Sequence, residues 1–307
     1  MIANFFNKTK PINFVVLSVL MVLVFIIGLI IGLPKEFTLV FFLKKVIYLL
    51  VSILTIFILN FIIRKNTLTD DNAFAILFFI IMLGFFSTTF FNKNIFIANF
   101  ILLFSFRRIY SLRTAIKPKE KIFDSAFWIG VASLFNIWSI IYLVLLFAAI
   151  WVFKKRDWKH ILIPVIGYIS PIFLAFTYLL MTDNTSTFYN FWVLDYSFNY
   201  SEYTSIKFLT PILFLFLFTL ISILPTIRKS LISKMDFKST WTVLIIHIIL
   251  SLIIVLVAPV KNGSEFLFLF FPLGILFANY MQIIKRYWVK ETILYLFLIV
   301  LITVYIA

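Results

Sequence analysis

The feature that most constrains this chain is a succession of apolar runs, many near the length at which an α-helix crosses a bilayer. About twenty helical residues cover the roughly 30 Å of a hydrocarbon core. The runs lack the alternation of outer-membrane β-strands. The sequence therefore predicts an all-α fold, a polytopic transmembrane helical bundle with one transmembrane domain over 1–307. About eleven membrane segments are expected, at 12–33, 46–63, 73–91, 95–106, 122–135, 137–153, 161–181, 208–226, 241–259, 266–284 and 291–307.

Composition narrows the class of protein. The chain is 64% hydrophobic and 13% charged, which leaves too little polar surface to cover a soluble globule of 307 residues. It has no Cys, so disulfides, thiolate nucleophiles and Cys-ligated metals are excluded. Its 27 Lys and Arg outnumber its 12 Asp and Glu, but they gather at the ends of apolar runs, as topology signals do. We therefore expect membrane lipids and no nucleic acid as partners.

The distribution of basic residues predicts the orientation. If the N-terminus is cytoplasmic, 21 of the 27 Lys and Arg, including every Arg, fall on the cytoplasmic side. Positive charge is enriched in cytoplasmic loops. The sequence therefore predicts an N-in, C-out, multi-pass protein of the bacterial cytoplasmic (inner) membrane.

The stretch 122–153 is too long for one span, and basic segments flank it on both sides. We expect two short helices with a hinge near Phe135 and Asn136. Whether they are two full spans or a short buried hairpin is left open.

Two segments are expected on the outer face. Residues 34–45 could form an amphipathic interfacial helix. The loop 182–206 is rich in aromatic residues among Asn, Asp, Ser and Thr. Its side chains could bind a glycan or a protein partner, or they could form the aromatic belt found at any membrane interface. The candidate binding residues are Tyr189, Trp192, Asp195, Tyr196 and Tyr200.

Missing residue types exclude several kinds of chemistry. Only His160 and His247 occur, too few for a di-iron oxygenase, and the zinc-protease motifs HExxH and HxxEH are absent. The chain has no P-loop and no GxGxxG. We expect no cofactor and no metal. His247 lies inside an expected span, where a neutral imidazole bonded to Ser, Thr or Asn on a neighbouring helix is favoured over a functional role.

The outer acidic residues supply the candidates for a general base. Glu36 follows the first span, at the depth of a lipid phosphate, and so is the preferred catalytic candidate. An exposed loop carboxylate beside Lys35 is the simpler interpretation.

The region from Ile95 to Thr182 carries a resemblance to a known family. A short span with a basic tail (FRRIYSLRTAIKPKEKIF) precedes an Asp-initiated hairpin, a basic turn (KKRDWKH) and a Pro-containing span (ILIPVIGYISPIFLAF). This order resembles the middle of the GT-C polyprenyl-phosphate-dependent glycosyltransferases. The resemblance implies Glu36 as the catalytic acid in the first outer loop and Lys44 and Lys45 as contacts to the phosphate of polyprenyl phosphate.

The whole chain is also similar to uncharacterised bacterial polytopic inner-membrane proteins, some of them labelled carotene-cleaving oxygenases. The two His residues argue against that chemistry.

Three functions remain. The first is an accessory or scaffold subunit of a cell-envelope complex with a membrane or envelope protein partner, because paired outer acids and outer Arg are lacking. The alternative is a GT-C-like glycosyltransferase that uses a polyprenyl-phosphate-linked sugar, and the second alternative is a secondary transporter. Whether the chain is an enzyme is left open.

Overall fold

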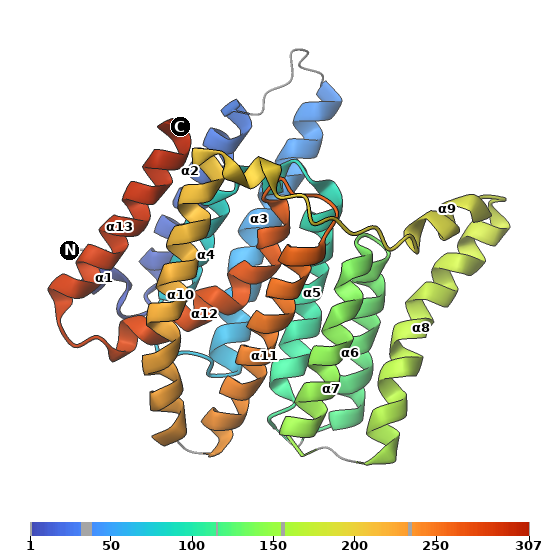
Figure 1. Ribbon diagram of the computed structural model, residues 1–307. Helices are drawn as coiled ribbons and strands as arrows, with labels where there is room; N and C mark the ends of the chain where they lie inside the picture. The colour runs from blue at the N-terminus through green and yellow to red at the C-terminus, as the bar shows by residue number, and fades with distance from the viewer. Residues whose placement is uncertain (1, 32–38, 115, 155–156, 233–234, 307) are drawn as a thin grey trace. The chain divides into compact units, whose positions relative to one another are not determined.

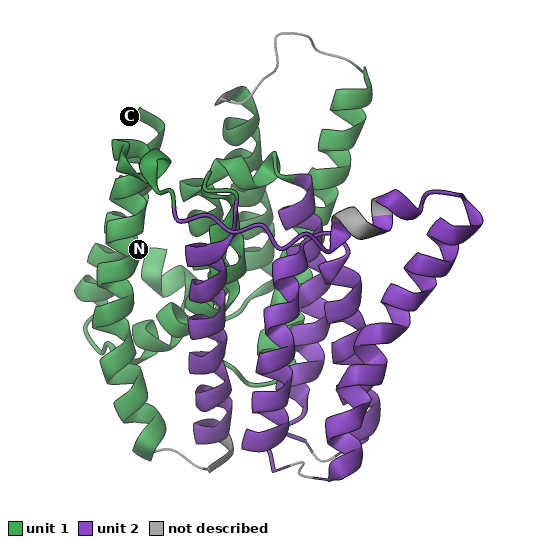
Figure 2. Cartoon of the chain, turned by 45° about the vertical axis from the view of Figure 1, so that its right-hand side comes forward, with its two compact units in different colours: residues 1–92, 199–232, 260–307 green, residues 93–198, 233–259 purple. Residues whose placement is uncertain are grey.

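The computed structural model describes residues 2–31, 39–114, 116–154, 157–232 and 235–306. Over these residues the chain is helical and contains no strands, which confirms the all-α prediction. The chain forms two compact units (Figure 2). Unit 1 comprises residues 1–92, 199–232 and 260–307, and unit 2 comprises 93–198 and 233–259. Each unit is built from separate stretches of sequence. The expectation of one transmembrane domain stays a prediction.

Unit 1 contains helices and short 3₁₀ turns (Figure 1). Its helices are α1 (Ile2–Phe6), α2 (Pro11–Ile31), α3 (Leu39–Lys65), α4 (Phe74–Phe85), α10 (Ile206–Ile232), α12 (Leu267–Ile283) and α13 (Tyr287–Ile306). Its 3₁₀ turns are η1 (Ser87–Phe90), η3 (Ser201–Thr204) and η4 (Ser264–Phe266).

The core of unit 1 is formed by α4 and α12, which pack against each other. All residues of α4 are buried, and so is 83% of the most apolar part of the helix 264–283, which includes α12, against 22% for the same part of α10. Helix α4 is apolar on every side and α12 carries few polar residues, so both can be enclosed by other helices. Gly274 lets them approach closely, because a Cβ there would lie 2.8 Å from the carbonyl oxygen of Ala75. Aromatic rings from four helices fill the surrounding space, with Phe78 4.8 Å from Phe297 and Phe218 4.7 Å from Phe277 between ring centroids.

Unit 2 contains a second set of helices. They are α5 (Lys93–Ser111), α6 (Pro118–Ser133), η2 (Ile137–Ile141), α7 (Tyr142–Val152), α8 (Trp158–Met181), α9 (Thr185–Phe191) and α11 (Met235–Val257). Helix α6 packs against both α5 and α8. Two glycines make the α6–α8 contact close: a Cβ at Gly130 would lie 2.6 Å from the oxygen of Tyr168, and one at Gly167 would lie 2.8 Å from the oxygen of Phe123. Small residues are common where membrane helices meet.

Seven of the described helices are long and apolar enough to cross a membrane. They comprise α2, α3, α8, α10, α11, α13 and a helix of residues 264–283 that includes α12. Two shorter apolar helices cover 74–85 and 137–152. Helices α5 and α6 occupy the expected segments 95–106 and 122–135 but carry charged residues such as Arg107, Arg108 and Asp124. Those charges lower their hydropathy, so eleven spans are not established by the helices themselves.

Two local expectations can be compared directly with the structure. The hinge near Asn136 is confirmed, because α6 ends at Ser133 and the Asn136 side chain caps η2 by accepting a hydrogen bond of 3.0 Å from the Trp138 N–H. The separate interfacial helix over 34–45 is not found in the part that is described, because residues 39–45 form the first turns of α3. Residues 34–38 lie outside the described residues.

Candidate functional site

The catalytic candidate and the two expected phosphate contacts differ in how the structure places them. Glu36 lies outside the described residues. Lys44 is exposed, whereas Lys45 is buried. Neighbouring residues on a helix point about 100° apart, so one faces outward and the other inward.

The Lys45 amine already contacts a backbone carbonyl oxygen and aromatic rings. Its Nζ donates a hydrogen bond of 2.9 Å to the carbonyl oxygen of Phe90 and lies 4.0 Å from the centroid of the Phe91 ring. A cation over an aromatic face is stabilised electrostatically. Lys45 therefore ties α3 to the end of η1. Phosphate binding by Lys44 and Lys45 stays a prediction.

The aromatic loop 182–206 begins with α9, continues as an extended segment and ends in η3. The side chain of Tyr189 lies outside the described residues. Trp192 is partly buried, and its indole Nε1 has no hydrogen-bond partner in the described structure. Two hydrogen bonds hold the extended backbone: the Asp195 oxygen accepts one of 3.2 Å from the Trp138 indole, and the Ser197 N–H donates one of 3.2 Å to the Val257 oxygen.

The apolar side chains of this extended segment project outward. Tyr196 is 69% exposed, Phe198 62% and Leu194 58%, although the backbone beside them is hydrogen-bonded. Trp192, Asp195 and Tyr196 belong to unit 2. An ordered segment with exposed aromatic side chains has the composition of a protein-binding surface.

Tyr200 belongs to unit 1, where it lies beside a polar turn at residues 261–264. The Lys261 amine lies 5.1 Å from the centroid of the Tyr200 ring. Lys261 is buried, and this burial lowers the pKa of its amine to about 8. Two hydrogen bonds hold the turn against η1 and the residues after it. The Thr88 hydroxyl donates to the Asn262 oxygen at 2.7 Å, and the Asn92 amide donates to the Ser264 hydroxyl at 3.0 Å.

Glu265 follows this turn and is completely buried. Neither of its carboxyl oxygens has a hydrogen-bond partner in the described structure. Glu202 is the acidic residue that interacts electrostatically with the Glu265 carboxyl group. A buried carboxyl group without partners is costly and could accept donors from a ligand. No local sequence pattern signals the burial of Glu265.

His247 lies in a separate polar group within unit 2. Its Nδ1 is 3.0 Å from the hydroxyl of Tyr110, and its ring centroid is 4.3 Å from that of Phe106. Tyr142 and Ser251 make a second hydrogen bond beside it, at 2.9 Å. The expected hydrogen bond to a neighbouring helix is present, but its partner is Tyr rather than Ser, Thr or Asn. These contacts join α5, α7 and α11, which favours a structural role.

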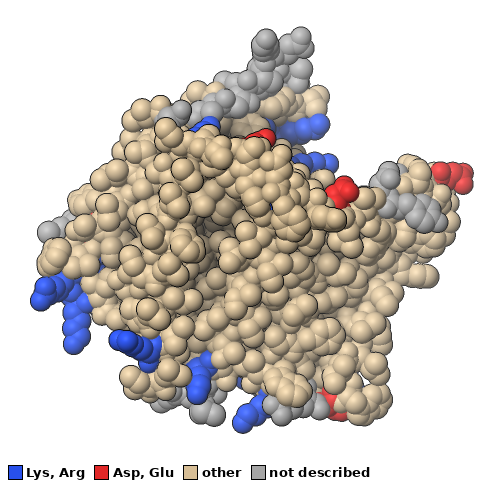
Figure 3. All heavy atoms as spheres, viewed as in Figure 1, with Lys and Arg blue, Asp and Glu red and all other residues tan. Residues whose placement is uncertain are grey.

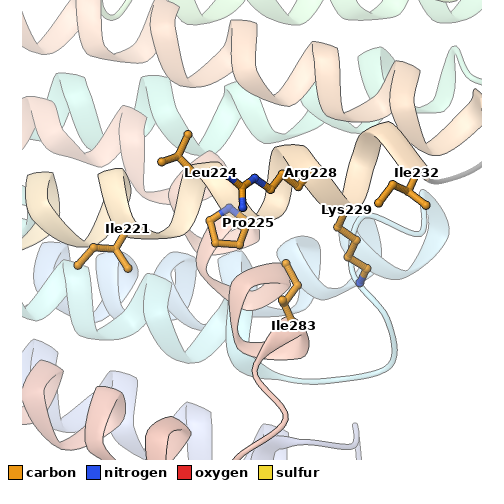
Figure 4. A pocket seen from close by; sticks show the side chains of 7 residues that line it. All are labelled: Ile221, Leu224, Pro225, Arg228, Lys229, Ile232 and Ile283. Carbon is orange, nitrogen blue, oxygen red and sulfur yellow. The ribbon is translucent and has the colours of Figure 1, made fainter.

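Two open grooves lie beside basic residues. A groove of about 530 Å³ on α10 is lined by apolar side chains and by Arg228 and Lys229, with the Arg228 guanidinium beside Leu224 and Pro225 (Figure 4). The Lys229 amine is 3.6 Å from the Asp70 carboxylate. The second groove, of about 540 Å³, lies between α5 and α6.

Uncharged side chains dominate the face of the molecule in Figure 3, and charged side chains occur there in small groups. Among the described residues, no group of three or more His, Cys, Asp or Glu side chains could hold a metal ion.

The apolar helices and their exposed apolar surfaces place the chain in the class of helical membrane proteins. The chain belongs to DUF6427, a family of unknown function whose model matches residues 8–307. No curated protein and no solved structure matches the chain. The resemblance to the GT-C enzymes therefore stays a prediction.

Proposed function

We propose that this protein is an accessory or scaffold subunit of a cell-envelope complex in the bacterial inner membrane. The observation that carries the proposal is the segment 193–198, whose backbone is held by Trp138 and Val257 while Tyr196 and Phe198 project into the surroundings. Aromatic side chains on an ordered backbone lose little conformational entropy on binding and are frequent at the centres of protein interfaces. The partner is a membrane or envelope protein.

The proposal includes a topology of eleven crossings with the N-terminus inside and the C-terminus outside. The concentration of Lys and Arg on one side of this threading supports it. In this topology the segment 193–198 faces outward. A reporter that is active only outside the cytoplasm, fused after Ala307, should be active, and a cytoplasmic reporter fused there should not. The reverse pattern would show that the segment 193–198 does not face outward and would refute this topology.

The experiment on function compares two double variants in native membranes. Tyr196→Ala with Phe198→Ala changes the exposed segment, and Tyr178→Ala with Phe173→Ala changes two aromatic side chains of matching exposure on α8. Tagged protein is extracted in mild detergent and its mass is measured by light scattering. We expect a stoichiometric partner with the unchanged protein and with the α8 variant, and a monomer with the segment variant. A monomer in all three samples would refute the proposal.

The glycosyltransferase is the alternative function. It ranks lower because the Lys45 amine is already bound to the Phe90 oxygen. Turnover of a polyprenyl-linked sugar that is lost in Glu36→Gln would establish it. The secondary transporter ranks third, because its midplane candidate His247 is fully buried and hydrogen-bonded to Tyr110. Counterflow of a substrate in liposomes would be its test.

A further inference from the structure

The groove between α5 and α6 combines positive charge with aromatic walls. Its α5 side is formed by Phe104, Arg107 and Arg108, and its α6 side includes Asp124 and Trp128. Each of these side chains is partly exposed, so the groove is open to its surroundings. All of them belong to unit 2. We call this the α5–α6 groove.

The polar end of the groove carries more positive than negative charge. The Arg108 guanidinium and the Asp124 carboxylate form an ion pair with an N···O distance of 2.6 Å, and both side chains are about one-third exposed. Arg107 adds a second guanidinium to the same groove. Partial burial and the charge of Arg108 lower the pKa of Arg107, and Asp124 opposes this effect. One carboxylate faces two guanidinium groups, so an additional anion would balance the charge.

The apolar part of the groove consists of aromatic rings. The ring centroids of Phe104 and Trp128 are 5.0 Å apart, and those of Phe127 and Trp128 are 5.6 Å apart. Trp is common where a membrane protein meets the headgroup region, since its ring is apolar and its indole N–H can donate a hydrogen bond. The groove therefore offers guanidinium groups for an anion beside rings for an attached apolar chain.

The groove lies at the end of α5 that enters the basic stretch 107–121. This stretch contains six basic residues and one acidic residue, Glu120, which pairs with Lys117 at 3.0 Å. The Lys121 amine binds the end of α5, where it donates a hydrogen bond of 2.7 Å to the Ser111 oxygen. Six basic residues against one acidic residue give this stretch a net charge of +5, and clusters of positive charge are typical of headgroup sites between membrane helices.

We propose that the α5–α6 groove binds the phosphate of an anionic membrane phospholipid, with the guanidinium of Arg107 on the phosphate and the start of an acyl chain against Phe104 and Trp128. The planar guanidinium can donate two parallel hydrogen bonds to a phosphate. Asp124 holds Arg108 in place and limits the affinity, because it competes with the phosphate for the same charge.

The test is native mass spectrometry of the purified full-length protein with phosphatidylglycerol or with phosphatidylcholine of the same acyl chains. We expect a preference for phosphatidylglycerol that falls about tenfold in Arg107→Gln, since one charged contact is lost. Arg113→Gln is the matched control. It removes the same charge from the same basic stretch, but Arg113 does not line the groove. The affinity of the Arg113→Gln variant for phosphatidylglycerol should equal that of the unchanged protein.

A second variant distinguishes a binding role from a structural one. Asp124→Asn removes the competing carboxylate and should increase the affinity for phosphatidylglycerol, although it breaks the ion pair with Arg108 and lowers the melting temperature slightly. Equal binding of the two lipids would overturn the proposal, as would equal losses in Arg107→Gln and Arg113→Gln. Complete displacement of the lipid by millimolar inorganic phosphate would show a site for the free anion and would also overturn it.

Discussion

The contact between α4 and α12 allows a quantitative test of how closely the core of unit 1 is packed. The perturbation is Gly274→Ala. The added Cβ would lie 2.8 Å from the carbonyl oxygen of Ala75, whereas ordinary contact begins at 3.4 Å, so the helices must separate by about 0.6 Å. Both helices are buried in unit 1, which leaves little room for this movement.

The expected magnitude combines two opposing effects. Overpacking of a buried contact costs about 1–3 kcal/mol. Replacing Gly by Ala inside a helix stabilises it by up to about 1 kcal/mol. The net result is a decrease of about 1–2 kcal/mol in the free energy of unfolding, or roughly 2–8 °C in melting temperature for a chain of this size.

The matched control is Gly28→Ala on α2. The nearest atom to its added Cβ is the Cβ of Ser87 at 3.2 Å, so only a small adjustment is required. We expect its melting temperature to stay within about 2 °C of the unchanged protein, because helix propensity offsets the contact. Thermal unfolding in one detergent, followed by intrinsic fluorescence, compares the variants. If Gly274→Ala were as stable as Gly28→Ala, the backbone contact would not limit the approach of the helices.

Three further predictions concern buried polar side chains. Tyr110→Phe removes the hydrogen bond to His247 and should lower the free energy of unfolding by about 1–2 kcal/mol in denaturant titration; an unchanged midpoint would contradict this. Lys121→Met should lower the melting temperature, because the Ser111 oxygen at the end of α5 loses its donor, whereas Lys119→Met should not. The pKa of Lys261 is about 8 in the fold against 10.5 ordinarily, so the unfolded chain binds more protons between these values and stability should rise with pH there; melting curves of Lys261→Met should lack this component.

Local sequence patterns predicted the helical segments and some of their ends. Asn136 was expected to break a helix, and it also caps the 3₁₀ turn that follows, because its side chain accepts a hydrogen bond of 3.0 Å from the Trp138 N–H. Both effects depend on residues close together in sequence, where capping preferences are strong. Hydropathy predicted the positions of the helices, because it also depends only on residues that are close together in sequence.

Long-range contacts decided the features that the sequence did not predict. The inward direction of Lys45 depends on the Phe90 oxygen, and the burial of Glu265 depends on how its turn packs. The Tyr110 partner of His247 is 137 residues away in the chain. No spacing of residues reports such pairs, which explains why the phosphate-binding prediction could name Lys44 and Lys45 but not distinguish their directions.

The enclosed position of α4 has a consequence for how the protein is made. About 180 residues separate the end of α4 from the start of α12. At roughly 5–20 residues per second, the ribosome therefore needs about 10–40 s to reach α12 after it has completed α4. During that interval α4 has no α12 to pack against. Because α4 has no polar face, it can remain in contact with lipid chains until α12 is synthesised. A charged side chain in place of Phe78 would make that contact unfavourable, so we expect it to prevent insertion of α4 before α12 is available.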